Sequence, residues 1–130
     1  MYKLGFIGCG NMATAIIGGA VTSQFLKGDE ICVFDVDTGK ADFLNKEYGV
    51  NVCSAVESLA ENCEFVVLAV KPQVFPTVLP QIKDSLNNTT VVSIGAGKTL
   101  EYIGNFLSFN FINDVSYDHY HIIISWDELS

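Results

Sequence analysis

Residues 2–19 read YKLGFIGCGNMATAIIGG, an apolar run that passes through closely spaced glycines into a helical pattern. The central Gly8-Cys-Gly10-Asn-Met-Ala13 fits G-x-G-x-x-G/A, a pattern that carries weight only where it joins a strand to a helix, as it does here. Gly8 suits a tight turn, Gly10 leaves room for a pyrophosphate, and Ala13 is small enough for close helix–strand packing. The stretch therefore predicts a dinucleotide-binding turn, with a plain strand–helix connection as the alternative.

The predicted turn needs no cationic side chain to hold an anion. The first turn of a helix presents backbone N–H groups that lack intrahelical partners, and it carries a partial positive charge. We expect the backbone amides between Cys9 and Ala13 to contact two linked phosphoryl groups. This arrangement suits a chain that has no arginine and a formal net charge of −8.

Length and composition limit the class of protein. A chain of 130 residues fits one domain, and its hydrophobic content of 49% excludes a disordered tail. Nucleic-acid binding needs clustered cations that displace counterions, and no basic run is present, so we expect no nucleic-acid partner. The apolar runs are too short to cross a bilayer and the start is unlike a signal peptide. We therefore expect no membrane association and a cytoplasmic location.

The chain contains four cysteines: Cys9, Cys32, Cys53 and Cys63. They form no C-x-x-C pair and no zinc-type spacing. Each lies in an apolar context, so we expect reduced thiols in the core of a cytosolic protein. His119 and His121 form an H-x-H pair, but no third ligand is evident and we expect no metal site.

Short apolar runs alternate with helical patterns along the chain. The predicted strands are residues 3–8, 30–35, 50–53, 65–70 and 89–94. They are nearly continuous in Val, Ile, Leu and Phe, as expected of strands that are covered on both faces. The alternation predicts an α/β fold, a Rossmann-type doubly wound sheet that is mainly parallel and carries helices on both faces.

The segments between these strands contain helix signals of unequal strength. Two apolar stripes at helical spacing are Met12, Ala13, Ile16, Ile17 and Ala20, and then Ala41, Leu44 and Tyr48. Ser54 and Glu57 have the spacing of a capping box that begins a third helix. Pro72, Pro76 and Pro80 predict an irregular start after Lys71, with helix only from about Pro76 or Pro80 to Leu86. Thr99 is the predicted cap of a last helix at residues 100–107.

Asp35 ends the second predicted strand, 22 residues after Ala13. A carboxylate at this point can accept both ribose hydroxyls of an adenosine and would repel a 2′-phosphate. Lys40 is the one cation nearby, so we predict NAD(H) in preference to NADP(H). A simple turn role for Asp35 is the alternative. S-adenosylmethionine is a weaker reading of the glycine turn, because such sites usually have an acidic residue before the glycines.

Three segments resemble one family: GFIGCGNMATAIIGG, VVLAVKPQVFPTVLPQI and VVSIGAGKTLEYI. Together they are similar to the cofactor domain of pyrroline-5-carboxylate reductases, within the broader NADP-oxidoreductase, coenzyme-F420-dependent type of Rossmann domain. The resemblance runs from about residue 3 to residue 107. It implies hydride transfer from NAD(P)H to the ring C=N of 1-pyrroline-5-carboxylate, which gives proline, in proline biosynthesis.

The resemblance also implies site residues. The pyrophosphate would contact Gly8, Gly10, Asn11, Met12 and Ala13. The region from the adenosine to the nicotinamide ribose would be bordered by Ala69, Val70, Lys71 and Pro72, and the nicotinamide by Ala96 and Gly97. These positions follow the carboxyl ends of predicted strands, where ligands bind in parallel sheets. An ordinary solvated lysine is the alternative for Lys71. The resemblance carries over no catalytic residue.

The end of the chain departs from the family, which continues into a Met-Pro-Asn-Thr-Pro-like segment and a helical domain that dimerises and completes the substrate pocket. We expect residues 1–107 to form the dinucleotide-binding domain. Residues 108–130 would be a divergent, aromatic-rich tail, with one extra strand at residues 120–125 and without that second domain, through truncation, frameshift or divergence. A cofactor domain alone does not orient an imine.

Two functions follow from these expectations. The first is the cofactor-binding half of a pyrroline-5-carboxylate reductase with little activity from this chain alone. The second is a noncatalytic dinucleotide-binding or regulatory module. The tail aromatics would cover the sheet face that a second domain otherwise meets, or would form a homo-oligomer contact.

Overall fold

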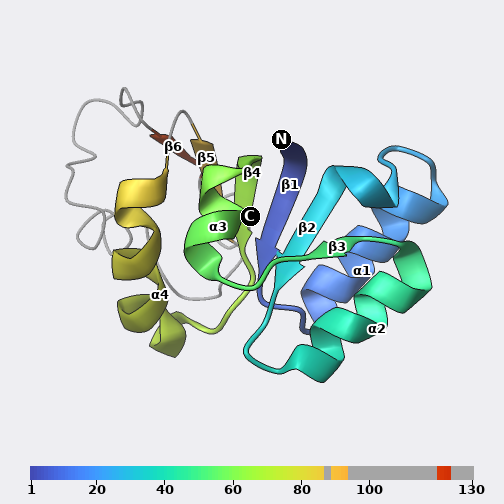
Figure 1. Cartoon of the computed structure of the whole chain (residues 1–130), viewed down its shortest axis with the longest axis horizontal. Coiled ribbons are helices and arrows are strands. Elements are labelled where there is room, and N and C mark those ends of the chain that lie inside the picture. Colours follow the sequence, from blue (N-terminus) through green and yellow to red (C-terminus); the bar gives the residue numbers. More distant parts are fainter. Residues whose placement is uncertain (87–88, 94–119, 124–130) are drawn as a thin grey trace.

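The computed structural model describes residues 1–86, 89–93 and 120–123, and these ranges contain a six-stranded parallel sheet in the order β3-β2-β1-β4-β5-β6 (Figure 1). The strands are β1 Tyr2–Ile7, β2 Ile31–Phe34, β3 Asn51–Val52, β4 Cys63–Leu68, β5 Thr89–Ser93 and β6 Tyr120–Ile123. The predicted Rossmann-type α/β fold is therefore confirmed. The strand expected at residues 120–125 is present as β6, which pairs with β5.

The helices lie on two faces of this sheet. They are α1 Asn11–Thr22, α2 Thr38–Tyr48, α3 Val56–Glu61 and α4 Phe75–Ile82, with 3-10 turns η1 Gly28–Glu30, η2 Pro72–Val74 and η3 Lys83–Ser85. In Figure 1, α1 and α2 lie beside β1, β2 and β3, while α3 and α4 lie toward β4 and β5. Within the described residues, no helix has the length and apolar content to cross a membrane.

Alternation along the strands produces two hydrophobic cores. Phe6 and Ile7 are neighbours in β1, both are almost fully buried, and they belong to different clusters. Phe6 packs with Ala13, Ile17 and Leu44 from α1 and α2. Ile7 belongs to the cluster that contains the buried residues of α3 and α4. Successive side chains of a strand point to opposite faces, so continuous apolar strands require cover on both sides.

The strand order reverses between β1 and β4. The chain steps outward from β1 to β2 and β3, and then returns to the other side of β1 to form β4 and β5. Because parallel crossovers are right-handed, these opposite directions put α1 and α2 on one face and α3 and α4 on the other. The loops after β1 and β4 therefore separate, which opens a crevice at the carboxyl edge of the sheet.

Local helix predictions were correct in part. Ala13 and Ile17 are buried as expected, but Met12 and Ile16 are 55% and 40% exposed. The predicted stripe was too wide because α1 packs through one narrow row of side chains. The Ser54–Glu57 capping box is also absent, since Ala55 is the N-cap of α3 and no side chain caps it.

The helix in the proline-rich segment begins next to Pro76, the first of the two expected starts, and well before Pro80, the second. The irregular start after Lys71 is the 3-10 turn η2, and α4 then begins at Phe75 with Pro76 in its first turn. Proline is tolerated there because the first amides have no intrahelical acceptor. Pro80 lies inside α4 on its exposed side. The α-helix ends at Ile82 and tightens into η3 before Leu86.

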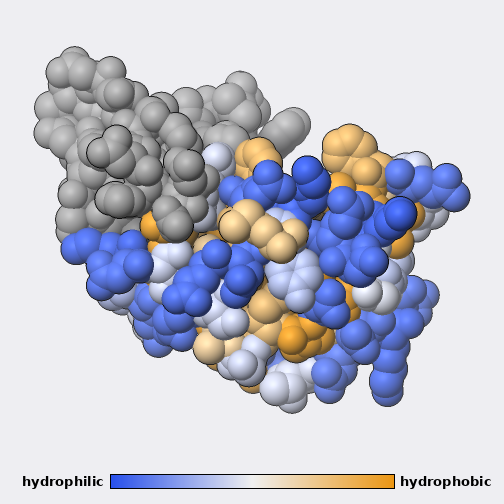
Figure 2. Space-filling view, turned by 45° about the horizontal axis from the view of Figure 1, so that its top comes forward, coloured by the Kyte–Doolittle hydropathy of each residue, from blue (hydrophilic) through white to orange (hydrophobic). Residues whose placement is uncertain are grey.

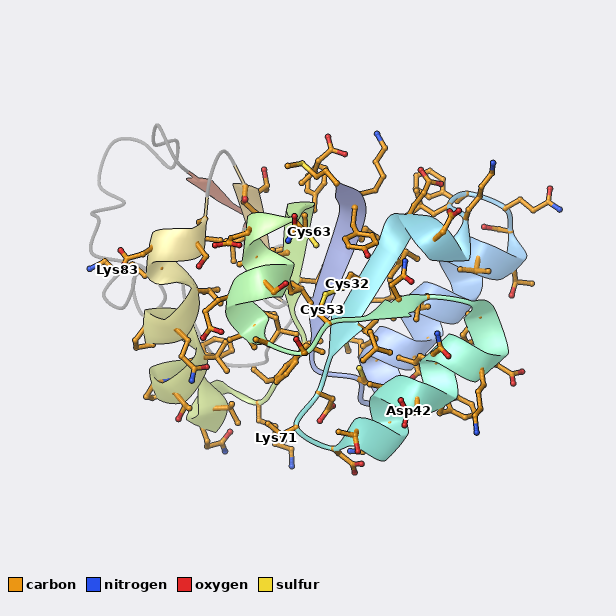
Figure 3. The ribbon with its side chains drawn as sticks, viewed as in Figure 1. Cys32, Asp42, Cys53, Cys63, Lys71 and Lys83 are labelled. Atoms are coloured by element: carbon orange, nitrogen blue, oxygen red, sulfur yellow. A yellow bond between two sulfur atoms is a disulfide. The ribbon has the colours of Figure 1, made fainter. Side chains whose placement is uncertain are left out.

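A disulfide joins Cys32 in β2 to Cys53 after β3, with the two Cα atoms 6.3 Å apart (Figure 3). The expectation of four reduced thiols was wrong for this pair. Pairing of β2 with β3, together with a 2.8 Å hydrogen bond from the Cys53 N–H to the Val33 carbonyl, brings the two cysteines together. Cys9 and Cys63 are buried free thiols, and burial raises the pKa of Cys63 to about 12.

The disulfide predicts a measurable stability difference. Titration of air-oxidised protein in denaturant should detect the thiols of Cys9 and Cys63 alone, and all four cysteines after reduction. Reduction should lower the free energy of unfolding by about 3 kcal/mol, because the crosslink closes a loop of roughly 20 residues in the unfolded chain. Urea unfolding with and without dithiothreitol measures this difference. A Cys32→Ala/Cys53→Ala variant, whose stability should not respond to reductant, is the control. Four reactive thiols before reduction would contradict the pairing.

Candidate dinucleotide site

Three loops meet at the carboxyl edge of the sheet. Residues 8–10 follow β1, residues 35–37 follow β2 and residues 69–71 follow β4. The Gly8 N–H donates to the Phe34 carbonyl and the Ala69 N–H donates to the Ile7 carbonyl, each at 2.8 Å. These bonds extend the pairing of the strands into the loops and fix the position of each loop relative to its neighbour.

The two glycines of the turn are required for different reasons. Gly8 has φ of +107°, and a Cβ at this position would lie 2.6 Å from the Ala69 carbonyl oxygen. Both the conformation and the close approach of β4 exclude a side chain. Gly10 has φ of −78°, and a Cβ there would meet nothing within 4 Å. Gly8 therefore serves the fold, whereas Gly10 leaves open space in front of α1.

The N-terminus of α1 faces this open space. Gly10 is the N-cap, no side chain caps it, and the first intrahelical bond runs from the Thr14 N–H to the Gly10 carbonyl at 2.9 Å. The amides of the first turn, at Asn11, Met12 and Ala13, thus have no acceptor within the helix. Such a set of N–H groups, at the positive end of the helix dipole, is suited to an anion such as a phosphate.

Asp35 lies beside the turn and accepts two backbone hydrogen bonds. Its Oδ2 accepts the Cys9 N–H and its Oδ1 accepts the Asp37 N–H, both at 2.8 Å. The Cys9 amide is therefore engaged within the protein, which narrows the expected set of phosphate donors to the amides that follow it. Asp35 also lines the cavity described below. The side chain that accepts hydrogen bonds at the turn is therefore also the one that the sequence predicts to accept ribose hydroxyls.

Cys9 supports the turn by packing rather than by reactivity. Its side chain is 4% exposed and belongs to the core beneath α1. Burial, reinforced by the negative charge of Asp35 and opposed by Lys40, raises the pKa of the Cys9 thiol to about 12. The thiol is neutral at physiological pH and cannot act as a thiolate nucleophile.

A cavity of about 270 Å³ opens between the loops after β1, β2 and β4. Its lining residues are Ile7, Gly8, Cys9, Gly10, Phe34, Asp35, Val36, Lys40, Ala69, Val70, Lys71, Val74 and Val78. A mainly apolar lining with a few charged groups is typical of sites that bind small organic molecules. In Figure 3, Lys71 lies at the end of the loop after β4 and extends from the lower edge of the sheet.

A second hollow of about 530 Å³ lies on the other side of the glycine turn. It is lined by Cys9, Gly10, Asn11, Thr14, Asp37, Gly39, Lys40 and Phe43. Cys9, Gly10 and Lys40 line both spaces, so the turn is the wall between them. A ligand that crosses the turn could therefore occupy both spaces while its centre contacts α1.

The predicted site residues are distributed unevenly around these spaces. Those that line the first cavity are Gly8, Gly10, Asp35, Ala69, Val70 and Lys71, and Asn11 lines the second. Met12 is exposed on α1 and its side chain lines neither space, whereas Ala13 is buried against the sheet and can offer a ligand only its amide. Pro72 begins η2. Ala96 and Gly97 lie outside the described residues.

Sequence reasoning missed the apolar walls of the first cavity. Val36, which is 89% exposed, and Val74 and Val78 from η2 and α4 line it together with Phe34. An apolar residue directly after the acidic strand end was the available signal for Val36. Among the described residues, no group of His, Cys, Asp or Glu is arranged to hold a metal ion. His119 lies outside those residues.

The known proteins with similar sequences are oxidoreductases. Residues 3–97 match the family described as NADP oxidoreductase, coenzyme F420-dependent. The pyrroline-5-carboxylate reductase of Escherichia coli (strain K12) is 38% identical over 106 residues, which are 81% of this chain and 39% of the relative. The corresponding enzyme of Arabidopsis thaliana is 35% identical over 97 residues, 74% of this chain and 35% of the relative.

Solved structures give the same result. A pyrroline-5-carboxylate reductase from Coxiella burnetii has a TM-score of 0.76 at 34% identity and covers 82% of this chain and 40% of that chain. A pyrroline carboxylate reductase from Plasmodium falciparum with NADP bound has a TM-score of 0.70 at 28% identity, over 82% of this chain and 38% of that chain. This chain therefore spans about two fifths of the length of these relatives.

Substitution of the two glycines by alanine should change the free energy of unfolding by very different amounts. Gly8→Ala should lower the free energy of unfolding by more than about 2 kcal/mol, because a Cβ at positive φ would also collide with the Ala69 carbonyl. Gly10→Ala should change it by less than about 0.5 kcal/mol, because its Cβ enters open space. Urea unfolding of both variants and the parent measures this contrast. Equal losses would contradict the assignment of distinct roles.

Proposed function

This chain belongs to the family of NADP oxidoreductases of the coenzyme F420-dependent type, and we propose that it binds a dinucleotide across the glycine turn. The pyrophosphate contacts the first-turn amides of α1, and the adenine occupies the apolar cavity between the loops after β2 and β4. The observation that carries this proposal is the open space at Gly10, directly in front of unpaired helix amides at the crevice where the strand order reverses.

We propose that NAD(H) is preferred over NADP(H). Asp35 lines the adenine cavity, and its carboxylate oxygens each keep a lone pair that can accept a ribose hydroxyl. A 2′-phosphate at this point would meet a negative charge. Lys40 lines both spaces, while the chain has no arginine for bidentate phosphate binding.

The reaction that the relatives suggest is hydride transfer from NAD(P)H to the C=N bond of 1-pyrroline-5-carboxylate. The chain supplies a cofactor site, but rapid transfer also requires an imine held close to the nicotinamide in a site that excludes water. We therefore propose that the chain acts as the cofactor-binding part of such an oxidoreductase, with little activity alone. The alternative is a noncatalytic dinucleotide-binding or regulatory module.

Further proposals concern organisation and location. Residues 1–107 are the dinucleotide-binding unit and residues 108–130 are the tail that contributes β6. Exposed apolar side chains, including Phe65 at 40%, support a homo-oligomer, which light scattering can test. The face in Figure 2 shows apolar patches of this kind among hydrophilic areas.

A cytoplasmic location requires Cys32 and Cys53 to be reduced in intact cells, which thiol trapping can test.

The cofactor proposal predicts a defined order of affinities. NADH should bind the purified chain at least about tenfold more tightly than NADPH, a difference of about 1.4 kcal/mol, because Asp35 repels the 2′-phosphate. Gly10→Ala should weaken both by about tenfold, because its methyl group occupies the space next to the pyrophosphate. Fluorescence titration or calorimetry measures these constants, with S-adenosylmethionine as the control ligand. Tighter NADPH binding would contradict the proposed preference.

The activity proposal predicts a separate result. The pure chain with NADH and 1-pyrroline-5-carboxylate should oxidise NADH no faster than the Gly10→Ala variant, because a cofactor site alone does not hold an imine close to the nicotinamide. Absorbance at the NADH band follows the reaction. Robust, substrate-dependent oxidation by the parent chain would establish a complete reductase and exclude the noncatalytic alternative.

A further inference from the structure

The glycine turn is held by few interactions. Its two glycines have no side chains and confer high conformational freedom on the unfolded turn. The Gly8 N–H is bound by the Phe34 carbonyl, and the Cys9 N–H is bound by the Asp35 carboxylate. Of these two hydrogen bonds, only the second depends on a side chain, so Asp35 is the position at which a substitution can release the turn without altering a strand.

The same carboxylate also reaches the next helix. Oδ1 of Asp35 accepts the Asp37 N–H at 2.8 Å, and Oδ1 of Asp37 accepts the Gly39 N–H at 3.1 Å at the start of α2. A continuous series of hydrogen bonds therefore runs from the glycine turn through Asp35 and Asp37 to the N-terminus of α2. The glycine turn before α1 and the start of α2, which both border the second hollow, are therefore linked through the side chains of Asp35 and Asp37.

We propose that Asp35 is a positioning residue for the glycine turn in addition to its role as ribose acceptor, so that discrimination against 2′-phosphate cannot be removed by replacing it. This inference rests on the proposed dinucleotide function. A small neutral residue would remove the repulsion of the 2′-phosphate. It would also leave the Cys9 amide without its acceptor in a partly buried setting, where an unmade hydrogen bond is costly, and would release the Asp37 amide to solvent.

The proposal therefore differs from a simple specificity switch. If Asp35 only selected between ribose and ribose phosphate, its removal would weaken NADH binding and strengthen NADPH binding. If it also positions the turn, its removal weakens both, because both ligands place their pyrophosphate at the same amides. An asparagine gives an intermediate case, since its single amide oxygen can accept one of the two N–H groups and its NH₂ group faces the other.

The test uses Asp35→Ser, Asp35→Asn and the charge-matched control Asp42→Ser. Asp42, labelled in Figure 3, is exposed on α2 and lines neither of the two spaces at the turn. Two measurements are made on each full-length chain: the dissociation constants of NADH and NADPH, and the exchange rate of the Cys9 amide hydrogen by NMR. Exchange reports the Cys9 hydrogen bond directly, and a residue that only contacts ribose would not change it.

We expect Asp35→Ser to weaken both dinucleotides by on the order of tenfold or more and to accelerate Cys9 exchange by a similar factor. Asp35→Asn should give smaller changes of the same sign, and it supplies the result if the serine variant does not fold. Asp42→Ser should match the parent in every measurement. Tighter NADPH binding by Asp35→Ser or Asp35→Asn, or unchanged Cys9 exchange in the folded variant, would overturn the proposal.

The exchange measurement also separates this proposal from the proposed function. If the parent chain binds neither dinucleotide, the proposed function fails. The positioning role is then supported by faster Cys9 exchange in the Asp35 variants and refuted by unchanged exchange, because the hydrogen bond exists in the ligand-free protein.

Discussion

The close approach of the turn after β1 to the end of β4 is the constraint on which the site depends. At Gly8 the backbone takes a positive φ, and the carbonyl of Ala69 occupies the space where a Cβ would lie. This contact allows β1 and β4 to pair along their full lengths and still diverge into two separate loops. The crevice at the strand reversal, and the orientation of α1 toward it, both follow from that turn.

The proposed phosphate site relies on backbone amides, which suits a chain of acidic composition. A protein with a net charge of −8 and no arginine can still attract an anion where helix amides are unpaired and aimed at open space. Asp35 accepts the amides of Cys9 and Asp37, so its charge is partly balanced by two N–H dipoles beside the first turn of α1. Asp35 also lines the cavity, and a carboxylate that accepts one bond at each oxygen has capacity for further donors such as hydroxyl groups.

The two cores have different relations to the cofactor site. The cluster beneath α1 and α2 contains Cys9 and Ala13 and so supports the glycine turn from below. The cluster beneath α3 and α4 contains Ile7 and Val78, with Phe34 and Val70 at its margin, and these residues are also the apolar walls of the cavity. The Cys32–Cys53 disulfide belongs to this second cluster and ties the short strand β3 to it. Stability and the shape of this cavity are therefore coupled on that face.

The sequence by itself determined the fold class, the strand positions to within two residues, and the polar and glycine positions of the turn, because these depend on hydrophobic period and local backbone freedom. It did not determine how wide the buried side of α1 is: Ala13 and Ile17 are buried as predicted, but Met12 and Ile16 are exposed. It also missed the valine walls and the pairing of Cys32 with Cys53. Those features depend on which strands are neighbours and on the direction of each crossover. Only the folded sheet brings together segments that are distant in the chain, and so only tertiary structure decided that Asp35 holds the Cys9 amide.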